Sequence, residues 1–306
     1  MYRIDVLCVG ASSFDLVFQV DHHPLPDEKT TADGFIGCGG GPAANASIMV
    51  ARMGLQAAFA GYLGLDLFGR LHLEELRAAG VNTDLVVRGE DPTPVSCVLV
   101  KPTGERSLVN YRAADPRGRR GSIATGISPR VMLFDGHEPD LSLAFLTGAR
   151  ERGIRTVLDA GSLNRGTALL FDRVEYPVCS ERFACDFTGT ASPEAALDRL
   201  NPPGRCVVVT LGEKGVLWKR DGKKGRVPAF PVRAVDTTGA GDVFHGAFAG
   251  SLAVGNSWDG MLAYACAAAA LCCTRLGART GIPTGPEVDR FLGAFRDRGL
   301  PPHPSG

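Results

Sequence analysis

Apolar runs of strand length alternate with helical stretches along most of this 306-residue chain, and this alternation limits the possible folds more than any other feature. We expect buried strands at residues 4–9, 57–61, 131–134, 156–158, 176–178 and 206–210. We expect helices at residues 43–53, 67–79, 141–152, 193–200, 240–253 and 258–276. Continuously apolar strands that alternate with helices are typical of a mostly parallel sheet with helices on both faces. The chain is therefore predicted to be an α/β protein.

Two segments interrupt the alternation, at about residues 16–38 and 95–112, and both are expected to form paired strands outside the main sheet. In the second segment, apolar runs flank the turn Pro102-Thr103-Gly104. A small sheet inserted near the carboxyl edge of a parallel sheet would act as a lid over a ligand crevice, although a plain surface hairpin is the alternative. We expect residues 1–306 to form one such domain with an inserted lid.

The composition excludes several classes of protein. Lys and Arg number 33, and Asp and Glu also number 33, so no strong field favours nucleic acid or a membrane surface. The nine cysteines lack a C-x-x-C pair, which indicates core thiols in a reducing compartment rather than a disulfide framework or zinc site. The first ten residues do not resemble a signal peptide, and the apolar stretch 261–273 is too short to span a membrane. We therefore expect a cytoplasmic protein.

The most informative motif is VDTTGAGDVF at residues 235–244, after which apolar residues recur with helical spacing. Gly239 and Gly241 allow an anion to approach the backbone closely, and a helix N-terminus offers free N–H groups and a favourable dipole. Asp242 could simply stabilise that dipole, by well under about 1 kcal/mol. A carboxylate beside an anion site would repel a phosphate, however, so removal of a proton from an attacking hydroxyl is the favoured role.

A second glycine cluster, Gly39-Gly40-Gly41, precedes an Ala-rich helix that contains Asn45. Its spacing formally fits a dinucleotide fingerprint, but that motif should follow the first buried strand, which here ends near Gly10. Asn45 is either a surface residue or, as we favour, bonded to another polar group.

A third cluster follows the apolar strand that ends at Thr210, where Gly212 and Gly215 bound a turn. The turn is either a common hairpin or a place where Gly212 admits a nucleotide. Asp15 follows the first strand closely, at the edge of the sheet where open α/β sheets bind ligands.

Together these motifs resemble the ribokinase-like (PfkB) family of carbohydrate kinases. Gly40-Gly41-x-x-x-Asn45 is similar to the first family signature, and the stretch from Asp236 to Asp242 is similar to the second. The order of motifs matches from Val6 to about Pro283. The resemblance implies a three-layer ribokinase-like sandwich with a central, mostly parallel sheet and a small β-sheet lid.

The same resemblance implies a role for each motif. Asp242 would be the catalytic base, and the N–H groups of Gly239, Ala240 and Gly241 would form the anion hole. The sugar hydroxyls would be held by Asp15, Gly40, Gly41, Asn45 and Asn110. The nucleotide side would be lined by Ser180, Thr210, Gly212 and Gly215. The implied donor is ATP with Mg²⁺.

Two metal sites are also implied. Many family members organise Mg²⁺ through an Asn-x-x-Glu motif, where this chain has Ser180-Glu181-Arg182-Phe183, so either Glu181 acts from a shifted position or phosphates and water hold the metal. A monovalent cation such as K⁺ would be bound by the carbonyl groups of Asp236, Thr238, Arg275 and Gly277.

Within the family, the segments around His245 and residues 273–283 look most like the sulfofructose kinase branch, near the ketohexokinases. His137 lies where that branch has a sulfonate-binding Arg; Arg112 could replace it or be a solvated loop residue. The expected function is ATP-dependent phosphorylation of a small sugar, a ketose or related compound. The alternatives are a nucleoside kinase, which would use Phe14 and Tyr111 for base stacking, and a non-catalytic binding protein. The exposed edges of a lid also predict a homodimer formed through it.

Overall fold

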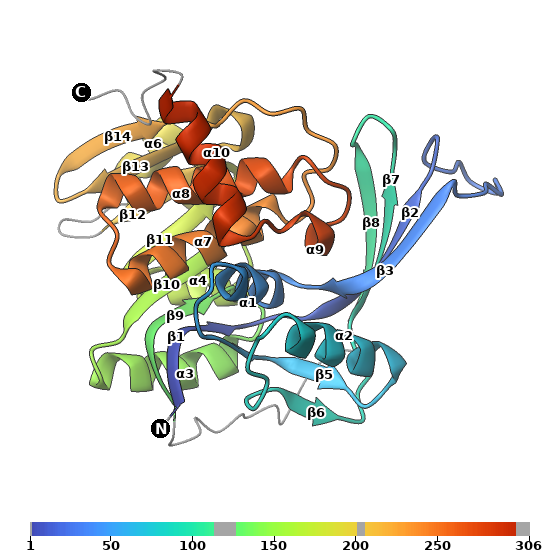
Figure 1. Ribbon diagram of the computed structural model, residues 1–306, viewed down its shortest axis with the longest axis horizontal. Coiled ribbons are helices and arrows are strands. Elements are labelled where there is room, and N and C mark those ends of the chain that lie inside the picture. The colour runs from blue at the N-terminus through green and yellow to red at the C-terminus, as the bar shows by residue number, and fades with distance from the viewer. Residues whose placement is uncertain (1, 113–126, 201–205, 298–306) are drawn as a thin grey trace.

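The computed structural model describes residues 2–112, 127–200 and 206–297, and its largest element is an eight-stranded sheet (Figure 1). The strand order is β14-β13-β12-β11-β10-β9-β1-β4. All neighbours pair in parallel except β12–β13 and β13–β14. The strands are β1 (Tyr2–Val9), β4 (Ala57–Ala60), β9 (Ile127–Phe134), β10 (Arg155–Ala160), β11 (Tyr176–Ser180), β12 (Val207–Thr210), β13 (Val216–Arg220) and β14 (Lys223–Val227).

Helices cover both faces of this sheet, which explains why its parallel strands are continuously apolar. One apolar core lies between the sheet and α1, α2, α7 and α8, and the other lies between the sheet and α3 to α6. The helices are α1 (Pro42–Arg52), α2 (Leu67–Ala78), α3 (Pro139–Glu151), α4 (Arg165–Phe171), α5 (Glu181–Thr188), α6 (Pro193–Leu200), α7 (Ala240–Val254), α8 (Trp258–Cys272), α9 (Ala278–Gly281) and α10 (Gly285–Asp297), with a short 3₁₀ turn, η1, at Gly212–Lys214.

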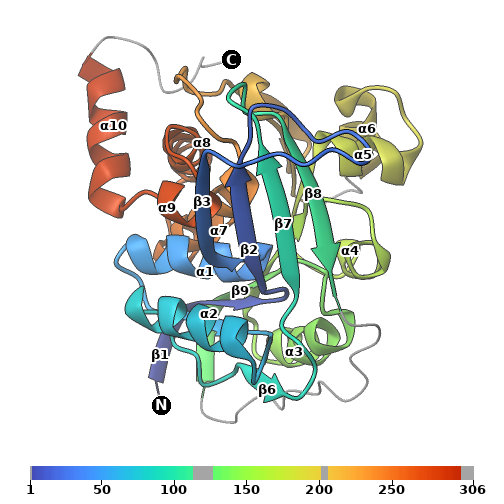
Figure 2. The ribbon, with the colours of Figure 1, turned by 90° about the vertical axis from the view of Figure 1, so that its right-hand side faces the viewer.

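A separate four-stranded sheet stands to one side of the main body (Figures 1 and 2). Its order is β3-β2-β7-β8, with β2 parallel to β7 and the outer pairs antiparallel. Its strands are β2 (Ser13–Gln19), β3 (Gly34–Gly40), β7 (Val95–Val100) and β8 (Arg106–Tyr111). A third, two-stranded sheet joins β5 (Tyr62–Gly64) to β6 (Val87–Gly89). The predicted arrangement, with a central mostly parallel sheet and a small additional sheet, is confirmed.

The predicted helix at residues 258–276 is too long, because α8 ends at Cys272. The N–H groups of Val235 and Asp236 both donate to the Cys273 carbonyl, at 2.7 and 3.2 Å, and thereby tie the end of the helix to the segment before α7. Helices α4, α5, α9 and α10 were not predicted from the sequence. In α5, Ser180 is the N-cap and its hydroxyl accepts from the Phe183 N–H at 3.0 Å.

The topology brings the chemically informative segments to one edge. Strands β1, β9, β10, β11 and β12 run in the same direction, so their carboxyl ends meet at this edge. The N-termini of α1 and α7 and the end of β3 lie beside it, because α1 packs against both α7 and β3. Motifs that are far apart in the sequence can therefore form one site.

Candidate active site

A side-chain hydrogen bond joins the two strongest sequence motifs, which lie 197 residues apart. Asn45 Nδ2, on α1, donates to Asp242 Oδ2, on α7, at 2.7 Å. Asn45 is buried, so the prediction that it bonds another polar group is correct. Its Oδ1 atom is buried and has no partner among the described residues, which is a costly arrangement unless a ligand supplies a donor there.

The first turn of α7 has the features of an anion site. Gly239 is the N-cap with a φ of 79°, and a Cβ on it would lie 2.8 Å from Ala278 Cβ, so the chain itself requires glycine there. A Cβ on Gly241, in contrast, would meet no protein atom within 4 Å. Open space therefore lies beside Gly241, in the first turn of the helix, while the Ala240 N–H donates to the Thr237 carbonyl at 3.3 Å. An anionic phosphoryl group fits this space and this polarity.

Asp236 holds the turn that precedes α7. Its Oδ1 accepts from the N–H and the hydroxyl of Thr238, at 2.8 and 2.7 Å, and its Oδ2 accepts from the Gly277 N–H at 2.8 Å. The two segments predicted to share a monovalent cation are thus adjacent. The Gly277 carbonyl already accepts from Gly281 N at 2.9 Å and from the Thr280 hydroxyl at 3.1 Å. Binding of a cation by the carbonyls of Asp236, Thr238, Arg275 and Gly277 remains a prediction.

Asp242 has the electrostatic character of a base that works near neutral pH. Removal of water by burial and the negative charge of Asp159 raise its pKa to about 7, and the hydrogen bond from Asn45 acts in the opposite direction. A carboxylate with such a pKa binds protons far more readily than an ordinary aspartate while still being ionised in part at pH 7.

A buried acid–imidazole pair beneath Asp242 was missed by the sequence analysis. Asp159, near the end of β10, lies 3.3 Å from Nδ1 of His245, on α7, and both side chains are almost fully buried. The same Nδ1 lies 2.6 Å from the Gly241 carbonyl, while Nε2 lies 3.2 Å from the Val178 carbonyl. Burial, followed by the charge of Asp135, raises the pKa of Asp159. The only sequence signal was an acidic residue at the end of an apolar strand.

The predicted sugar-binding residues Asp15, Gly40 and Gly41 lie together at the end of the small sheet. Ser13 Oγ donates to Asp15 Oδ1 at 2.9 Å, and a Cβ on Gly40 would lie 2.1 Å from Asp15 Oδ2. Gly41 has a φ of 95°, and a Cβ there would lie 2.6 Å from the Ala11 carbonyl oxygen. These glycines let the Asp15 carboxyl and the start of α1 lie close together.

Asn110 lies on the same face of the small sheet as Asp15. Ser96 is directly opposite Asp15 on one side and Asn110 on the other, and directly paired residues share a face. Successive residues alternate faces, so Phe14 and Tyr111 point to the opposite face. Phe14 stacks on Phe68 with a ring separation of 5.0 Å. The two aromatic residues considered for base stacking therefore lie away from the predicted sugar site.

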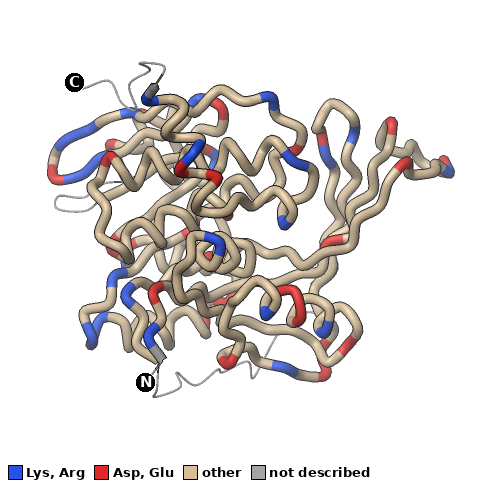
Figure 3. Tube along the Cα trace, viewed as in Figure 1, with Lys and Arg blue, Asp and Glu red and all other residues tan. Residues whose placement is uncertain are grey.

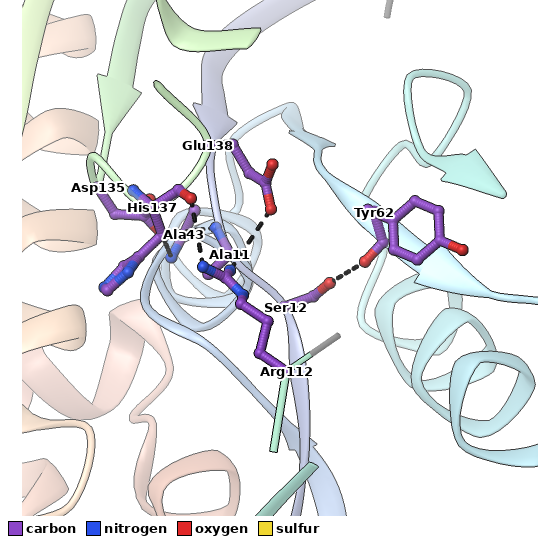
Figure 4. Close-up of polar contacts among 8 residues, drawn as sticks. All are labelled: Ala11, Ser12, Ala43, Tyr62, Arg112, Asp135, His137 and Glu138. Carbon is purple, nitrogen blue, oxygen red and sulfur yellow. Dashed lines mark hydrogen bonds and ion pairs between the residues drawn. The ribbon is translucent and has the colours of Figure 1, made fainter. Parts of the chain in front are cut away.

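Asp135 fixes the entrance of α1 (Figure 4). Its carboxylate accepts from the N–H groups of Ala11 at 2.7 Å, Ala43 at 3.1 Å and His137 at 2.9 Å. This explains the acidic residue after β9 as a structural cap of three backbone segments. The hydroxyl of Ser12 donates to the Tyr62 carbonyl nearby.

Arg112 and His137, considered for a sulfonate site, lie side by side (Figure 4). Arg112 Nη1 donates to the His137 carbonyl at 3.3 Å, and Nη2 lies 3.4 Å from Glu138 Oε1. Glu138 partly neutralises the Arg112 charge, so this corner does not present a simple cationic pocket.

The predicted nucleotide residues follow β11 and β12, at the same edge of the sheet. Gly212 has a φ of 58°, and a Cβ on it would face open space. A Cβ on Gly215 would lie 2.0 Å from the Val227 carbonyl oxygen, so the close approach of β14 accounts for that glycine without a ligand. Thr210 ends β12, and its hydroxyl donates to the Cys179 carbonyl at 3.4 Å. Ser180 donates to the Gly161 carbonyl at 2.9 Å.

An arginine of the small sheet reaches the loop before α7 and was also missed. Arg106 Nη1, on β8, donates to Thr238 Oγ1 at 2.6 Å. This contact joins the small sheet to the turn that leads into the anion site.

No group of three or more His, Cys, Asp or Glu side chains in residues 2–112, 127–200 and 206–297 could hold a metal ion. Within the same ranges, no helix is both long enough and apolar enough to cross a membrane. Figure 3 shows acidic and basic residues mixed along the trace, in line with the equal numbers of the two kinds.

Several known proteins resemble this chain in sequence and in overall fold. Ribokinase from Bacillus subtilis is 28% identical over 293 residues, covering 94% of this chain and 99% of that protein. Fructokinase-1 from Oryza sativa subsp. japonica is 30% identical over 291 residues, covering 85% and 90%. A crystal structure of a protein described as a putative ribokinase from Agrobacterium tumefaciens has a TM-score of 0.87 at 29% identity, covering 96% of this chain and 99% of that one.

Ribokinase from Arabidopsis thaliana, in a complex with ribose and ATP, has a TM-score of 0.80 at 25% identity, covering 95% of this chain and 99% of that one. The sequence model of the pfkB family of carbohydrate kinases matches residues 3–118 and 146–285, so this protein belongs to that family.

Proposed function

We propose that this protein transfers the γ-phosphoryl group of ATP to a hydroxyl of a small sugar, with Asp242 as the general base. The observation that carries this proposal is the hydrogen bond between Asn45 and Asp242. It joins a partly buried carboxyl of raised pKa to an Asn whose Oδ1 has no partner among the described residues, beside open space at a helix N-terminus. A substrate hydroxyl would donate to Asn45 Oδ1, and a phosphoryl anion would occupy the space beside Gly241.

In the proposed reaction, the sugar hydroxyl oxygen attacks the γ-phosphorus in line with the bond to the β-phosphate oxygen. An O–P bond to the sugar forms, the bond to ADP breaks, and the hydroxyl proton passes to Asp242. The N–H groups of Gly239, Ala240 and Gly241 would stabilise charge on the transferred group. Asp15, Gly40, Gly41, Asn45 and Asn110 would orient the sugar, and Thr210, Gly212 and Ser180 would line the nucleotide side.

ATP fits the chain because the space beside Gly241 is open and borders the N-terminus of α7, whose dipole favours negative charge. Mg²⁺ would neutralise the phosphate charges when bound. Phosphates and water would coordinate it, and the predicted contributor from the protein is Glu181, at the start of α5. Dependence on K⁺ stays part of the proposal.

The test uses purified protein, ATP and Mg²⁺ with separate panels of ketoses, aldoses, sulfonated sugars and nucleosides. We expect ADP release with at least one sugar, and loss of about 10²-fold or more in kcat for Asp242→Asn. Turnover only with nucleosides would favour the nucleoside kinase, which the position of Phe14 and Tyr111 on the sheet face opposite Asp15 argues against. ATP binding without any Asp242-dependent turnover would favour a binding protein.

We further propose a homodimer formed through the outer face of the small sheet, the face opposite Asp15 and Asn110. Apolar side chains are exposed there: Phe35 is 58% exposed, Val109 72% and Tyr111 57%. Such a patch is unusual on a monomer, and a second copy would present a matching surface. A monomeric mass by light scattering at micromolar concentration would refute the dimer. We keep the cytoplasm as the proposed compartment, because all nine cysteines are free thiols.

A further inference from the structure

Charged side chains bind both backbone polar groups of Gly39, the residue directly before the predicted sugar-binding glycines. Its N–H donates to Glu75 Oε2 at 2.8 Å, and its carbonyl accepts from Arg279 Nε at 3.0 Å. Gly39 lies on β3, an edge strand of the small sheet, so these backbone groups have no neighbouring strand to pair with. Arg279 and Glu75 take the place of that strand.

Arg279 is an unusual residue for this task, because its side chain is buried. Only 7% of Arg279 is exposed, and its Nη2 lies 3.0 Å from His72 Nε2. Its Nη1 has no hydrogen-bond partner in the part of the chain that the structure describes. The nearest carboxylate oxygen to Nη1 belongs to Glu75, at 3.9 Å. A buried cation with an unused donor is costly, so a structural edge cap alone is a poor reason to keep it.

Arg279 belongs to α9, and the residues at the start of this helix contact the anion-binding turn before α7. The Gly277 N–H, at the N-cap of α9, donates to Asp236, which also holds Thr238. Ala278 lies against Gly239, where any Cβ would come within 2.8 Å. A four-residue helix thus contacts the phosphoryl end of the site through Gly277 and Ala278, and the sugar end through Arg279.

Resting on the proposed function, we propose that Arg279 is a positioning residue: it fixes the Gly39 peptide, and with it Gly40 and Asp15, relative to the anion-binding turn before α7. The acceptor hydroxyl and the phosphoryl group are thereby held at a set distance. The Arg279 charge also acts on Asp15: burial raises the pKa of that carboxyl, while hydrogen bonds from Ser13 and Ser96 and the charge of Arg279 lower it. The net effect is a raised pKa of Asp15, and the charge of Arg279 limits this rise.

Two variants test this role. Arg279→Lys keeps the charge but cannot bond the Gly39 carbonyl and His72 at the same time. Glu75→Ala removes the acceptor of the Gly39 N–H, and Glu75 is partly exposed, so the substitution is tolerated. We expect acceptor KM to rise, and kcat to fall, by roughly 10-fold or more in Arg279→Lys and by about 3-fold or more in Glu75→Ala, because small misplacements of reacting groups are costly. The Kd of a non-hydrolysable ATP analogue should stay within about twofold.

The matched controls are Arg130→Lys and Glu74→Ala. Arg130 ties β9 to the Ala253 carbonyl at the far end of α7, and Glu74 is the exposed neighbour of Glu75 on α2. Neither substitution should change the acceptor KM or kcat. A merely structural cap would lower the melting temperature of Arg279→Lys and Glu75→Ala while leaving acceptor KM unchanged, and this result would overturn the proposal.

The same comparison is possible without turnover. Calorimetry measures acceptor Kd with the ATP analogue present, in Asp242→Asn protein carrying either variant. Weaker acceptor binding with Arg279→Lys and with Glu75→Ala supports the positioning role, and unchanged acceptor binding refutes it. Failure of the wild-type protein to phosphorylate any sugar counts against the proposed function instead. Should Arg279→Lys not fold, Glu75→Ala decides the question by the same measurements.

Discussion

Replacement of Asp242 by Asn should make the protein more stable while it removes activity. Asn is nearly the same shape, and its Oδ1 can still accept from Asn45. In the wild type, burial and the charge of Asp159 raise the pKa of Asp242 from 3.8 to about 7. The folded protein therefore binds this proton more tightly than the unfolded chain, so stability is lost as pH rises from about 4 to about 7.

The size of the effect follows from the pKa. At 1.36 kcal/mol per pH unit, the rise bounds the penalty at about 4 kcal/mol above pH 7. Because Asp159 is also raised and the two carboxyls share the repulsion, we expect a gain of about 1–3 kcal/mol for Asp242→Asn at pH 8. Thermal and urea unfolding of both proteins at pH 8 and pH 4.5 measure it. The gain should largely vanish at pH 4.5. Equal stability at pH 8, or a gain that is the same at both pH values, would refute the electrostatic reasoning.

Two further predictions concern neighbouring residues. Asp159→Asn removes a charge that raises the pKa of Asp242. The acid limb of the kcat–pH profile should therefore move down by roughly one pH unit. An unmoved limb would contradict the coupling between Asp159 and Asp242. Gly241→Ala should fold normally, because its Cβ meets no atom, yet lose kcat by placing a methyl group in the phosphoryl space. Gly41→Ala should instead lower the melting temperature, since its φ is 95° and its Cβ would strike Ala11; equal effects of the two substitutions on melting would contradict this distinction.

The parts of the fold that the sequence predicted well are those specified by local pattern. The apolar strands and the glycine-rich start of α7 are indicated by residues adjacent in the sequence, so most strands and helices of the main sheet could be predicted. The end of α8 was misplaced because a tertiary contact, from Val235 and Asp236 to the Cys273 carbonyl, decides it. Helix α10 was missed although Val288, Phe291 and Phe295 recur with helical spacing, so this miss is not explained by a lack of local pattern.

The candidate site shows the same division. Asn45 and Asp242 belong to recognisable motifs, and their contact across 197 positions agrees with the pairing of those motifs. Arg279 contacts Gly39 across 240 positions, and nothing in its local sequence distinguishes it from a loop arginine. Asp159 and His245 similarly become a pair only when β10 packs against α7. Such residues depend on topology, which local pattern does not encode.

The central claim is Asp242-dependent phosphoryl transfer to a sugar, and following the γ-phosphorus tests it most directly. ATP labelled at the γ-phosphate is incubated with Mg²⁺, the protein and the best sugar of the panel, and the label is traced by ³¹P NMR or mass spectrometry. The account predicts a sugar phosphate ester with wild-type protein, formed about 10²-fold or more slowly by Asp242→Asn, which still binds ATP. Label released only as inorganic phosphate, or ester formed equally fast by Asp242→Asn, would contradict it.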